Sequence, residues 1–327
     1  MTAQRPIGSG FGAASTAANV IAGRDLGGKI AIVTGGGAGI GVETVRALRS
    51  AGAKVIVPAR DPDKAAAALA GIDAEIFAMD LAEPTTITAF ADAFLARDVP
   101  LHMLVNSAGI MATPFARDAR GYETQFATNH LGHFQLATRL LPALRKAAGA
   151  RVVSVSSWGH RFSNVVLDDL HYERRAYDPW IGYGQSKTAN ILFAVAFDAR
   201  FANDKIRAFS LHPGTIASTD LGRHVPRAVL VKAGVIDEAG HPILDPSRQL
   251  KTAAQGAATS VWCATSPQLK GMGGVYCENA DIAPVVEDPK ADRQLASKPN
   301  GVLAYAIDRE AADRLWTISE ALLRSEH

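Results

Sequence analysis

The stretch YGQSK pairs a phenol with an ammonium, because Tyr183 and Lys187 stand four residues apart in a run of helical character. Residues at this spacing lie on one face of a helix and can share one environment. A phenol with a pKa of about 10 is a poor base at neutral pH, but a neighbouring positive charge favours its ionised form. The pair could therefore act as a general acid or base, with the phenol pKa lowered by Lys187. The alternative is a surface tyrosine beside a solvated lysine.

Ser157 and Asn129 are the other candidates for proton chemistry. Ser157 ends the run ARVVSVSS, where a hydroxyl could donate to an oxygen that gains charge during a reaction. Ser156 is its rival, because adjacent residues of a strand face opposite ways. Asn129 lies in a long predicted helix, and its amide could instead serve a backbone bond. Each residue alone has an ordinary structural explanation, but the set in this order predicts a catalytic centre.

The stretch TGGGAGIG joins the first buried strand run to a helical run. Glycines at such a turn let the backbone approach a pyrophosphate, whose charge is met by amides at the helix N-terminus. The spacing G-x-x-x-G-x-G differs from the usual G-x-G-x-x-G fingerprint, so a tight turn without a ligand is the alternative. The candidate cofactor-binding residues in this stretch are Gly35, Gly37, Gly39, Ile40 and Gly41.

The end of the second strand run bears on which dinucleotide binds. Dinucleotide folds usually place an acidic residue there, on the adenosine ribose hydroxyls. Here Ala59 takes that position and Arg60 follows, and a guanidinium suits a 2′-phosphate. We therefore predict that NADP(H) is preferred over NAD(H), with Arg60 at the phosphate. The alternatives are a solvated Arg60 and ribose binding by Asp61.

These residues need a scaffold that brings strand ends together. From Lys29 onward, short β-branched runs alternate with Ala- and Leu-rich amphipathic stretches. Apolar strands in such an alternation indicate an α/β fold, with a mostly seven-stranded parallel sheet covered by helices on both faces. We expect strands within 29–36, 54–60, 74–81, 101–109, 150–157, 205–214 and 273–284. We expect helices at 40–52, 61–71, 84–98, 121–145 and 183–201.

Length and patterning favour a single domain preceded by an arm. The arm, residues 1–28, carries a short helix that ends near Ala22 and is capped by Ser15 or Thr16. Residues 29–327 form the domain, with insertions near 158–182 and 221–250. Both insertions follow strands, so we expect them at the carboxyl ends of the sheet, where ligands bind in open α/β folds.

Composition argues against several functional classes. The 327 residues carry 34 basic and 32 acidic side chains without a block of like charge, so no nucleic-acid partner is expected. Arg24 and Asp25 interrupt the mildly apolar N-terminal stretch, so no membrane anchor or signal peptide is predicted. Two cysteines, Cys263 and Cys277, suit a reducing, cytoplasmic setting. No metal site is predicted, since no metal-ligand pattern links His130, His133, His160 and His212.

Five motifs occur in order: TGGGAGIG, NSAG at 106–109, SVSS ending at Ser157, YGQSK, and HPG at 212–214. From about residue 15 nearly to the C-terminus, the chain thereby resembles the short-chain dehydrogenase/reductase family. NHLGHF, SKTANILF and HPGTIASTDLGRH are similar to the branch that contains retinol dehydrogenases and the WW-domain oxidoreductase. The resemblance implies a Rossmann-type, doubly wound sheet and a nicotinamide cofactor, and it supports NADP(H) at Arg60.

The resemblance also implies roles for single residues. Tyr183 would be the general acid or base, and Lys187 would hold the nicotinamide ribose. Ser157 would bind the substrate oxygen, and Asn129 would support a water that passes protons to Lys187. Cofactor contacts are implied for Asp80, Leu81, Asn106, Ala108, Gly109, Pro213 and Gly214. Two departures are Ser107, where many relatives have asparagine, and a TIAST loop one residue longer than usual, which leaves Ser218 and Thr219 both open.

The predicted function is NADP(H)-dependent hydride transfer between nicotinamide and a carbonyl or alcohol substrate. A small to medium apolar substrate would suit a wall of aromatic and apolar side chains, which could equally pin a loop: Trp158, Phe162, Trp180 and Ile181. The alternative function is a nucleotide-sensing or scaffold protein that kept the fold without efficient turnover. The Ala- and Leu-rich helices that carry Asn129 and Tyr183 are consistent with a homodimer and equally with packing inside one chain.

Overall fold

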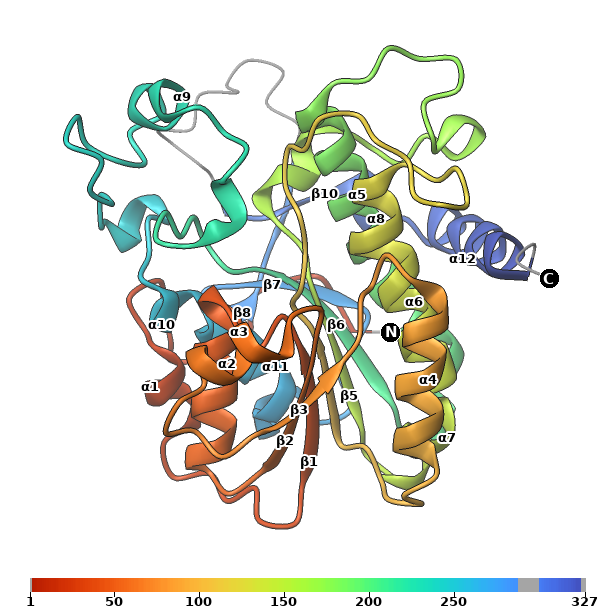
Figure 1. Cartoon of the computed structure of the whole chain (residues 1–327). Helices are drawn as coiled ribbons and strands as arrows, with labels where there is room; N and C mark the ends of the chain where they lie inside the picture. Colours follow the sequence, from red (N-terminus) through yellow and green to blue (C-terminus); the bar gives the residue numbers. More distant parts are fainter. Residues whose placement is uncertain (1, 288–299, 325–327) are drawn as a thin grey trace.

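The computed structural model describes residues 2–287 and 300–324 and has one eight-stranded sheet at its centre (Figure 1). The strand order is β3-β2-β1-β4-β5-β6-β7-β8, in which β1 to β7 run parallel and β8 pairs antiparallel with β7. The strands are β1 (Ile30–Thr34), β2 (Lys54–Ala59), β3 (Glu75–Ala78), β4 (Met103–Asn106), β5 (Arg151–Val155), β6 (Arg207–His212), β7 (Val275–Glu278) and β8 (Asp281–Ile282). A separate parallel pair is formed by β9 (Val285–Val286) and β10 (Val302–Leu303).

Helices cover both faces of the sheet, because strand side chains alternate between two apolar layers. Ile32 and Leu104 pack toward α4 (Pro84–Leu95), α6 (Gly132–Arg139), α7 (Leu141–Lys146), α8 (Pro179–Phe201) and α12 (Arg309–Arg324). Val33 and Val105 pack toward α1 (Ala17–Ile21), α2 (Gly39–Ser50) and α11 (Ala258–Thr265). The predicted doubly wound fold is thereby confirmed. Among the described residues, no helix is long and apolar enough to cross a membrane.

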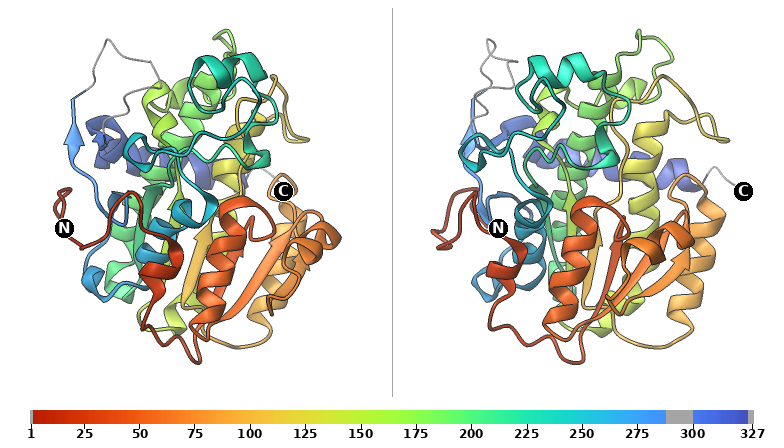
Figure 2. Two further views of the ribbon diagram at one scale, coloured as in Figure 1. Left: turned by 90° about the vertical axis from the view of Figure 1, so that its left-hand side faces the viewer. Right: turned by 60° about the vertical axis from the view of Figure 1, so that its left-hand side comes forward.

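Two insertions lie beyond the carboxyl ends of the parallel strands. One precedes α8, and the other contains α9 (Arg227–Lys232); both stay at the same end of the molecule in all views (Figures 1 and 2). A backbone bridge between Thr215 and Leu250 closes the base of the second insertion. That insertion has a small apolar cluster of its own, around Val235 and Ile236.

The sheet has one more strand than the sequence predicted. The segment 273–284 was expected to be a seventh strand and its exit loop, but it forms β7, a tight turn and the antiparallel β8. Asn279 and Ala280 both have positive φ values, 55° and 57°. Two consecutive positive φ values give the turn that suits a two-residue hairpin, although alanine rarely adopts one. All seven predicted parallel strands are present, and this turn adds the short antiparallel strand β8.

Two helices differ from their predicted bounds. The catalytic candidate Tyr183 was placed at a helix start, but α8 begins at Pro179, with Asp178 accepting hydrogen bonds from the amides of residues 180 and 181. Aspartate before proline is a helix-start pattern that the prediction overlooked. The single helix expected at 121–145 is divided into α5 (Thr124–Phe126), a π turn (Ala127–Leu131), α6 and α7. Pro142 has no amide hydrogen, which favours the break before α7.

The N-terminal arm lies along the β7–β8 edge of the sheet. Thr16, one of the two predicted caps, accepts from the third residue of α1. The carboxylate of Asp281 accepts from the amides of residues 7–9 at 3.0 to 3.2 Å. The side-chain amide of Gln4 bonds to both backbone polar groups of Tyr276, at 2.9 and 2.8 Å. The arm thus meets backbone groups of β7 that would otherwise lie at an open edge.

Candidate active site

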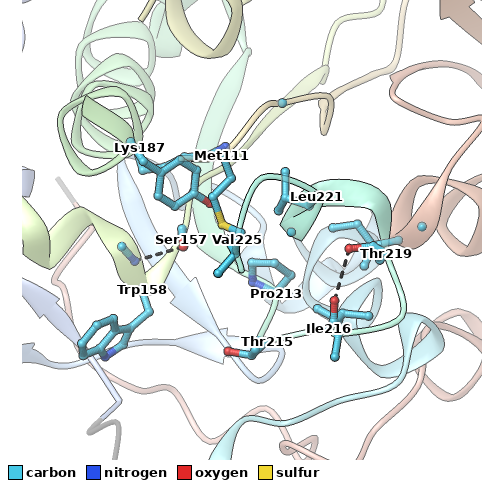
Figure 3. Close-up of a pocket in the computed structure, with 18 of the residues that line it drawn as sticks. Met111, Ser157, Trp158, Lys187, Pro213, Thr215, Ile216, Thr219, Leu221 and Val225 are labelled. Atoms are coloured by element: carbon cyan, nitrogen blue, oxygen red, sulfur yellow. Dashed lines mark hydrogen bonds between the residues drawn. The ribbon is translucent and has the colours of Figure 1, made fainter. Parts of the chain in front are cut away.

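A cavity of about 380 Å³ opens where β1, β4, β5 and β6 end. Its walls come from the glycine loop between β1 and α2, the segments after β4 and β5, and α8. Residues 212–235, which include α9, contribute the facing side. Figure 3 shows Ser157 and Lys187 on one side of this cavity and Leu221 and Thr219 on the other.

Three of the predicted catalytic side chains meet on one wall of this cavity. Tyr183 and Lys187 lie one turn apart on α8, and both are buried. The Lys187 ammonium donates to the Val155 carbonyl at 3.1 Å and lies 5.7 Å from the centre of the Tyr183 ring. Ser157 lines the same wall and is hydrogen-bonded to Tyr183. This arrangement can give a proton to, or take one from, an oxygen bound in the cavity.

Burial dominates the electrostatics of the Tyr183–Lys187 pair. It raises the pKa of Tyr183 to about 12, because the phenolate would lose its contact with water. It lowers the pKa of Lys187 to about 8 for the same reason. The sequence predicts that Lys187 favours the phenolate; in the protein by itself burial acts in the opposite direction and raises the phenol pKa overall, while the effect of Lys187 itself stays a prediction. Tyr183 is therefore a protonated phenol at neutral pH.

Ser156 and Ser157 have different partners at the end of β5. The Ser156 hydroxyl donates to the Lys187 carbonyl oxygen at 2.7 Å, which ties β5 to α8. The Ser157 hydroxyl accepts from the Gly159 amide at 3.0 Å and faces the cavity beside Tyr183. Of the two serines that the sequence left as rivals, Ser157 is the one placed to reach a substrate oxygen.

Asn129 lies in the π turn, behind the cavity wall. Its side chain binds both polar backbone groups of Ile110, at 2.9 and 3.0 Å, and donates to the Ser186 hydroxyl at 2.9 Å. A Cβ on Gly109 would lie 3.1 Å from the Asn129 side-chain oxygen and 3.4 Å from the Lys187 nitrogen. Glycine at 109 therefore lets the amide and the ammonium approach each other, as a shared water would require.

The glycine loop is too tightly packed to hold side chains. A Cβ on Gly35 would lie 2.8 Å from the Cα of Ala108, and a Cβ on Gly39 would lie 2.8 Å from Cγ2 of Thr219. Such a bare backbone, leading into the N-terminus of α2, fits a dinucleotide pyrophosphate. Among the predicted glycine-loop residues, the cavity is lined by Gly35, Gly39 and Ile40, while Gly37 and Gly41 pack behind them.

Arg60 and Asp61 differ in how they are engaged. The Asp61 carboxylate accepts from the Lys64 amide at 3.0 Å and caps α3 (Pro62–Ala68). This cap explains Asp61 without a role at the ribose. Arg60 is exposed at the end of β2, and within residues 2–287 and 300–324 its guanidinium has no hydrogen bond or ion pair. A positive charge without a protein partner can meet a phosphate.

The remaining cofactor candidates divide into those at the cavity and those behind it. Ala108 and Gly109 line the cavity. Asp80 accepts from the Ala82 amide at 2.9 Å, and Leu81 packs against Gly132. Asn106 is buried at the end of β4, and its side-chain amide has no hydrogen-bond partner in the described part of the chain. The predicted cofactor contacts of Asp80, Leu81 and Asn106 stay predictions.

The segment after β6 brings backbone to the cavity. Pro213 and Gly214 line it, and Gly214 has a φ of 99°, which an L side chain rarely adopts. Thr219 also lines it, while its hydroxyl donates to the Ile216 carbonyl at 3.2 Å (Figure 3). Ser218 is not among the lining residues. Of Ser218 and Thr219, which the sequence left as alternatives, the geometry therefore favours Thr219 as the residue that faces the cavity.

Aromatic rings form the wall next to Tyr183. Trp158 meets Phe162 edge to face at 5.5 Å, and Phe162 meets Trp180 at 5.6 Å; all three line the cavity. Ile181 was predicted to join them but is not a lining residue. Because α8 begins at Pro179, Ile181 follows Trp180 on the helix and points about 100° away from it. The prediction for Ile181 was wrong.

The apolar wall contributed by the second insertion was missed. The insertion was predicted, but not which of its side chains face the site. The sequence signal was the run VPRAVLVKAGV, with apolar residues at helical spacing around α9. The lining residues from this segment include Leu221, Val225, Val229, Leu230 and Val235.

Comparison with known proteins finds relatives that are named as oxidoreductases and dehydrogenases. The profile of the short chain dehydrogenase family matches residues 29–229. The "Probable oxidoreductase" of Streptomyces antibioticus is 46% identical over 311 residues, which cover 92% of this chain and 99% of the relative. Retinol dehydrogenase 12 of Homo sapiens is 34% identical over 91% of this chain and 87% of the relative. An uncharacterised Mycobacterium paratuberculosis protein of known structure has a TM-score of 0.71 and 30% identity, covering 95% of this chain and 98% of that one.

The matched residues contain the glycine loop, the wall formed by Ser157, Tyr183 and Lys187, and the segment after β6. The similarity to a retinol dehydrogenase agrees with the branch that the NHLGHF and SKTANILF motifs indicated. The chain belongs to the short-chain dehydrogenase/reductase family.

Proposed function

We propose that this protein is an NADP(H)-dependent oxidoreductase that transfers a hydride between nicotinamide and a carbonyl or alcohol group of an apolar substrate. The observation that supports this most directly is the meeting of Ser157, Tyr183 and Lys187 on one wall of a cavity that also contains the glycine loop. A bound nicotinamide dinucleotide would supply or accept the hydride. The chain's own side chains would bind the reacting oxygen and move its proton.

Tyr183 is the proposed general acid for carbonyl reduction. Burial keeps its phenol protonated, with the pKa raised to about 12, so it can donate to an oxygen that becomes an alkoxide. Ser157 lies beside it and would donate a hydrogen bond to the same oxygen. Oxidation of an alcohol needs the phenolate, which an additional positive charge in the cavity would favour. The protein alone is thus better prepared for reduction than for oxidation.

Lys187 on the cavity wall and Asn129 behind it are proposed to supply protons to Tyr183. The buried ammonium of Lys187 can hold ribose hydroxyls and favour the ionised phenol. Its pKa of about 8 lets it exchange protons near neutral pH. Gly109 leaves the approach between Lys187 and Asn129 open, and a water held there would pass protons toward Tyr183.

Arg60 is the proposed reader of the 2′-phosphate, because its guanidinium is exposed and unpaired within the described residues while Asp61 is used as a cap. Arg60→Ala should lower kcat/KM with NADPH about tenfold to a hundredfold, the range for a lost charge-assisted hydrogen bond, and leave NADH little changed. Arg46→Ala, an exposed arginine of α2 paired with Glu43, is the matched control. An unchanged NADPH/NADH ratio in Arg60→Ala would reject this role.

The decisive experiment is a turnover screen of the purified protein. NADPH oxidation is followed against aldehydes, ketones and quinones of increasing apolar size, and NADP⁺ reduction against the matching alcohols. The aromatic and aliphatic walls predict that apolar substrates of small to medium size react best. Binding of NADPH without turnover across the whole panel would support a nucleotide-sensing role instead.

Tyr183→Phe tests the proposed acid. Removing the hydroxyl should lower kcat at least about a hundredfold, within the range for general acid–base groups. The dissociation constant of NADPH, measured by fluorescence titration, should change little, because the ring and its packing are kept. Retention of most activity would place the proton donor elsewhere.

The homodimer that the sequence suggested would have to use other surfaces than those proposed. α12 packs against α8 within the chain, and its Trp316 contacts Phe134 of α6 and Phe193 of α8. We therefore propose a monomer with respect to these helix faces. The cytoplasmic location stays a prediction from composition.

A further inference from the structure

The sequence showed no metal-ligand pattern for His133, and in the structure both of its ring nitrogens have hydrogen-bond partners. It lies near the start of α6, directly after the π turn, and its side chain is buried. Nδ1 lies 3.0 Å from the Asn129 carbonyl oxygen. Nε2 lies 2.9 Å from the hydroxyl of Thr34, the last residue of β1. The ring therefore joins the π turn to the end of the first strand.

The partners of Thr34 fix the positions of the protons. Its hydroxyl accepts from the Ser107 and Ala108 amides at 2.9 and 3.1 Å, which uses both acceptor positions of the oxygen. Its hydrogen must then donate, and His133 Nε2 at 2.9 Å is a better acceptor than the Val105 carbonyl at 3.5 Å. Nε2 is consequently unprotonated, and the single proton of the neutral ring lies on Nδ1, directed at Asn129.

The electrostatics of the ring agree with this neutral form. The pKa of His133 is lowered to about 4: burial is the largest cause, the bond to the Asn129 carbonyl acts in the opposite direction, and the nearby Lys187 ammonium contributes to the lowering. At neutral pH the ring is thus one fixed donor and one fixed acceptor. No rearrangement of the hydrogen bonds is needed for it to bridge its two neighbours.

The two ends of this bridge serve different parts of the site. Ser107 and Ala108 are cavity residues, and Ala108 is the residue against which Gly35 of the glycine loop packs. At the other end, Asn129 holds Ile110 and Ser186 with its side chain, next to Lys187 on α8. One half of the bridge therefore supports the cofactor side, and the other half supports the proton-transfer side.

We propose that His133 is a positioning residue that couples the cofactor wall at 107–108 to Asn129. It touches neither the cavity nor a reacting atom, and it acts by fixing the Thr34 hydroxyl and the Asn129 carbonyl in one rigid chain of hydrogen bonds. The role at the cofactor rests on the proposed function. The bridge itself does not, since it is formed by the chain alone.

Two amide substitutions separate the two halves of the bridge. In His133→Asn the side-chain nitrogen can stand where Nδ1 was, so the bond to Asn129 is kept and the acceptor for Thr34 is lost. In His133→Gln the side-chain oxygen can stand where Nε2 was, so the bond from Thr34 is kept and the donor to Asn129 is lost. Each variant removes one hydrogen bond, so one should affect cofactor affinity and the other should affect the rate.

The expected outcome is a split between affinity and rate. His133→Asn should raise the dissociation constant of NADPH roughly threefold to tenfold, the effect of one lost hydrogen bond, with kcat at saturating cofactor within twofold of the parent. His133→Gln should keep the dissociation constant within twofold and lower kcat roughly threefold to tenfold. The dissociation constant is measured by titration without substrate, so this part of the test does not depend on turnover.

His130 provides the matched control. It is equally buried in the neighbouring turn, but its Nε2 bonds to Ser319 of α12 at 2.8 Å, away from the cavity. His130→Asn and His130→Gln should lower the melting temperature without separating affinity from rate. If both His133 variants change affinity and rate together, or neither exceeds its His130 control, His133 is a packing residue and the proposal is overturned.

A spectroscopic measurement on the unmodified protein covers the case in which the variants fold poorly. Histidine ring ¹⁵N resonances should show His133 neutral at pH 7 with its proton on Nδ1, and addition of NADP⁺ should shift them more than those of His130. An Nε2 proton, or shifts no larger than those of His130, would overturn the bridge. A protein without turnover on any substrate would instead refute the proposed function, while the tautomer and the titration would still test this inference.

Discussion

Tyr183 and Lys187 show how burial changes the chemistry that two neighbouring side chains suggest. Both side chains are almost fully enclosed, at 3% and 4% exposure, so each is shifted toward its neutral form. The phenol is held as an acid and the ammonium is made easier to deprotonate. A positively charged ligand in the cavity would act against the raised pKa of Tyr183 and would lower the pKa of Lys187 further, which makes the ionisation of this pair responsive to what the cavity contains.

The buried ammonium of Lys187 should make stability depend on pH. Its pKa is lowered from 10.5 to about 8, so the unfolded chain binds this proton more tightly than the folded protein. The stability associated with the group is fully present above about pH 10.5 and is lost as pH falls toward 8, a difference of about 3 kcal/mol. Lys187→Met should therefore gain stability relative to the parent at pH 7, and the gain should shrink as pH rises toward 10.5.

Urea unfolding of both proteins at pH 7, 9 and 10 measures this difference. Lys54→Met is a suitable control, because Lys54 is an exposed lysine that forms an ion pair with Glu75 at 2.8 Å. If the difference in unfolding free energy between Lys187→Met and its parent stays constant across these pH values, the pKa of Lys187 is the same in the folded and unfolded states and the prediction is wrong.

At the scale of elements, the contact between α8 and the segment after β5 positions Tyr183 and Ser157, the proposed catalytic groups. A Cβ on Gly159 would lie 2.8 Å from Cε1 of Tyr183 and 3.3 Å from Oγ of Ser157. Gly159→Ala should therefore displace the Tyr183 ring or the Ser157 hydroxyl and lower kcat about tenfold or more, since small displacements of catalytic groups are costly. Steady-state kinetics on the best substrate of the screen would measure it.

The control for this substitution is Gly12→Ala in the N-terminal arm. A Cβ there has no atom within 4 Å, and its φ is not in the left-handed region. Its activity should equal that of the parent. If Gly159→Ala is equally active, the contact between this segment and α8 is loose enough to absorb a methyl group and does not position Tyr183.

The elements that the sequence predicted best are those whose signals are local. Alternating apolar runs indicated β1 to β7 and the helices between β1 and β6, but not the helices between β6 and β7; TGGGAGIG and YGQSK located the loop and the helix face of the site. The π turn around Asn129 was not predictable in this way, because its residues fit an ordinary helix and the register change is favoured by tertiary hydrogen bonds. The same holds for His133, whose partners Thr34 and Asn129 come from different elements.

At the scale of the whole molecule, α12 covers helix faces of α6 and α8. The sequence left open whether such faces pair between two subunits or pack within one chain. Trp316 packs edge to face on Phe134 at 4.6 Å and lies under the guanidinium of Arg200 at 4.7 Å. The Tyr122 hydroxyl donates to the carbonyl of Leu322 near the end of the helix at 3.0 Å. The apolar faces of α6 and α8 are therefore covered within the chain.

Trp316→Ala should lower the free energy of unfolding by about 3 to 5 kcal/mol, the usual cost of removing a buried tryptophan. The parent should be a monomer by light scattering at micromolar concentration, whereas the variant should self-associate as the faces of α6 and α8 become accessible. A dimeric parent would show that another surface pairs subunits. A stable, monomeric variant would show that α12 is not needed to cover these faces.

The N-terminal arm can form its contacts with β7 and β8 only after those strands have been synthesised. Gln4 bonds to Tyr276, 272 residues later, and Asp281 holds the amides of residues 7–9. On a ribosome that adds about 5 to 20 residues per second, the arm is made roughly 14 to 54 s before its partner strand exists. Residues 4–9 are thus made long before their partners, and until β7 and β8 leave the ribosome the hydrogen bonds that hold this part of the arm cannot form.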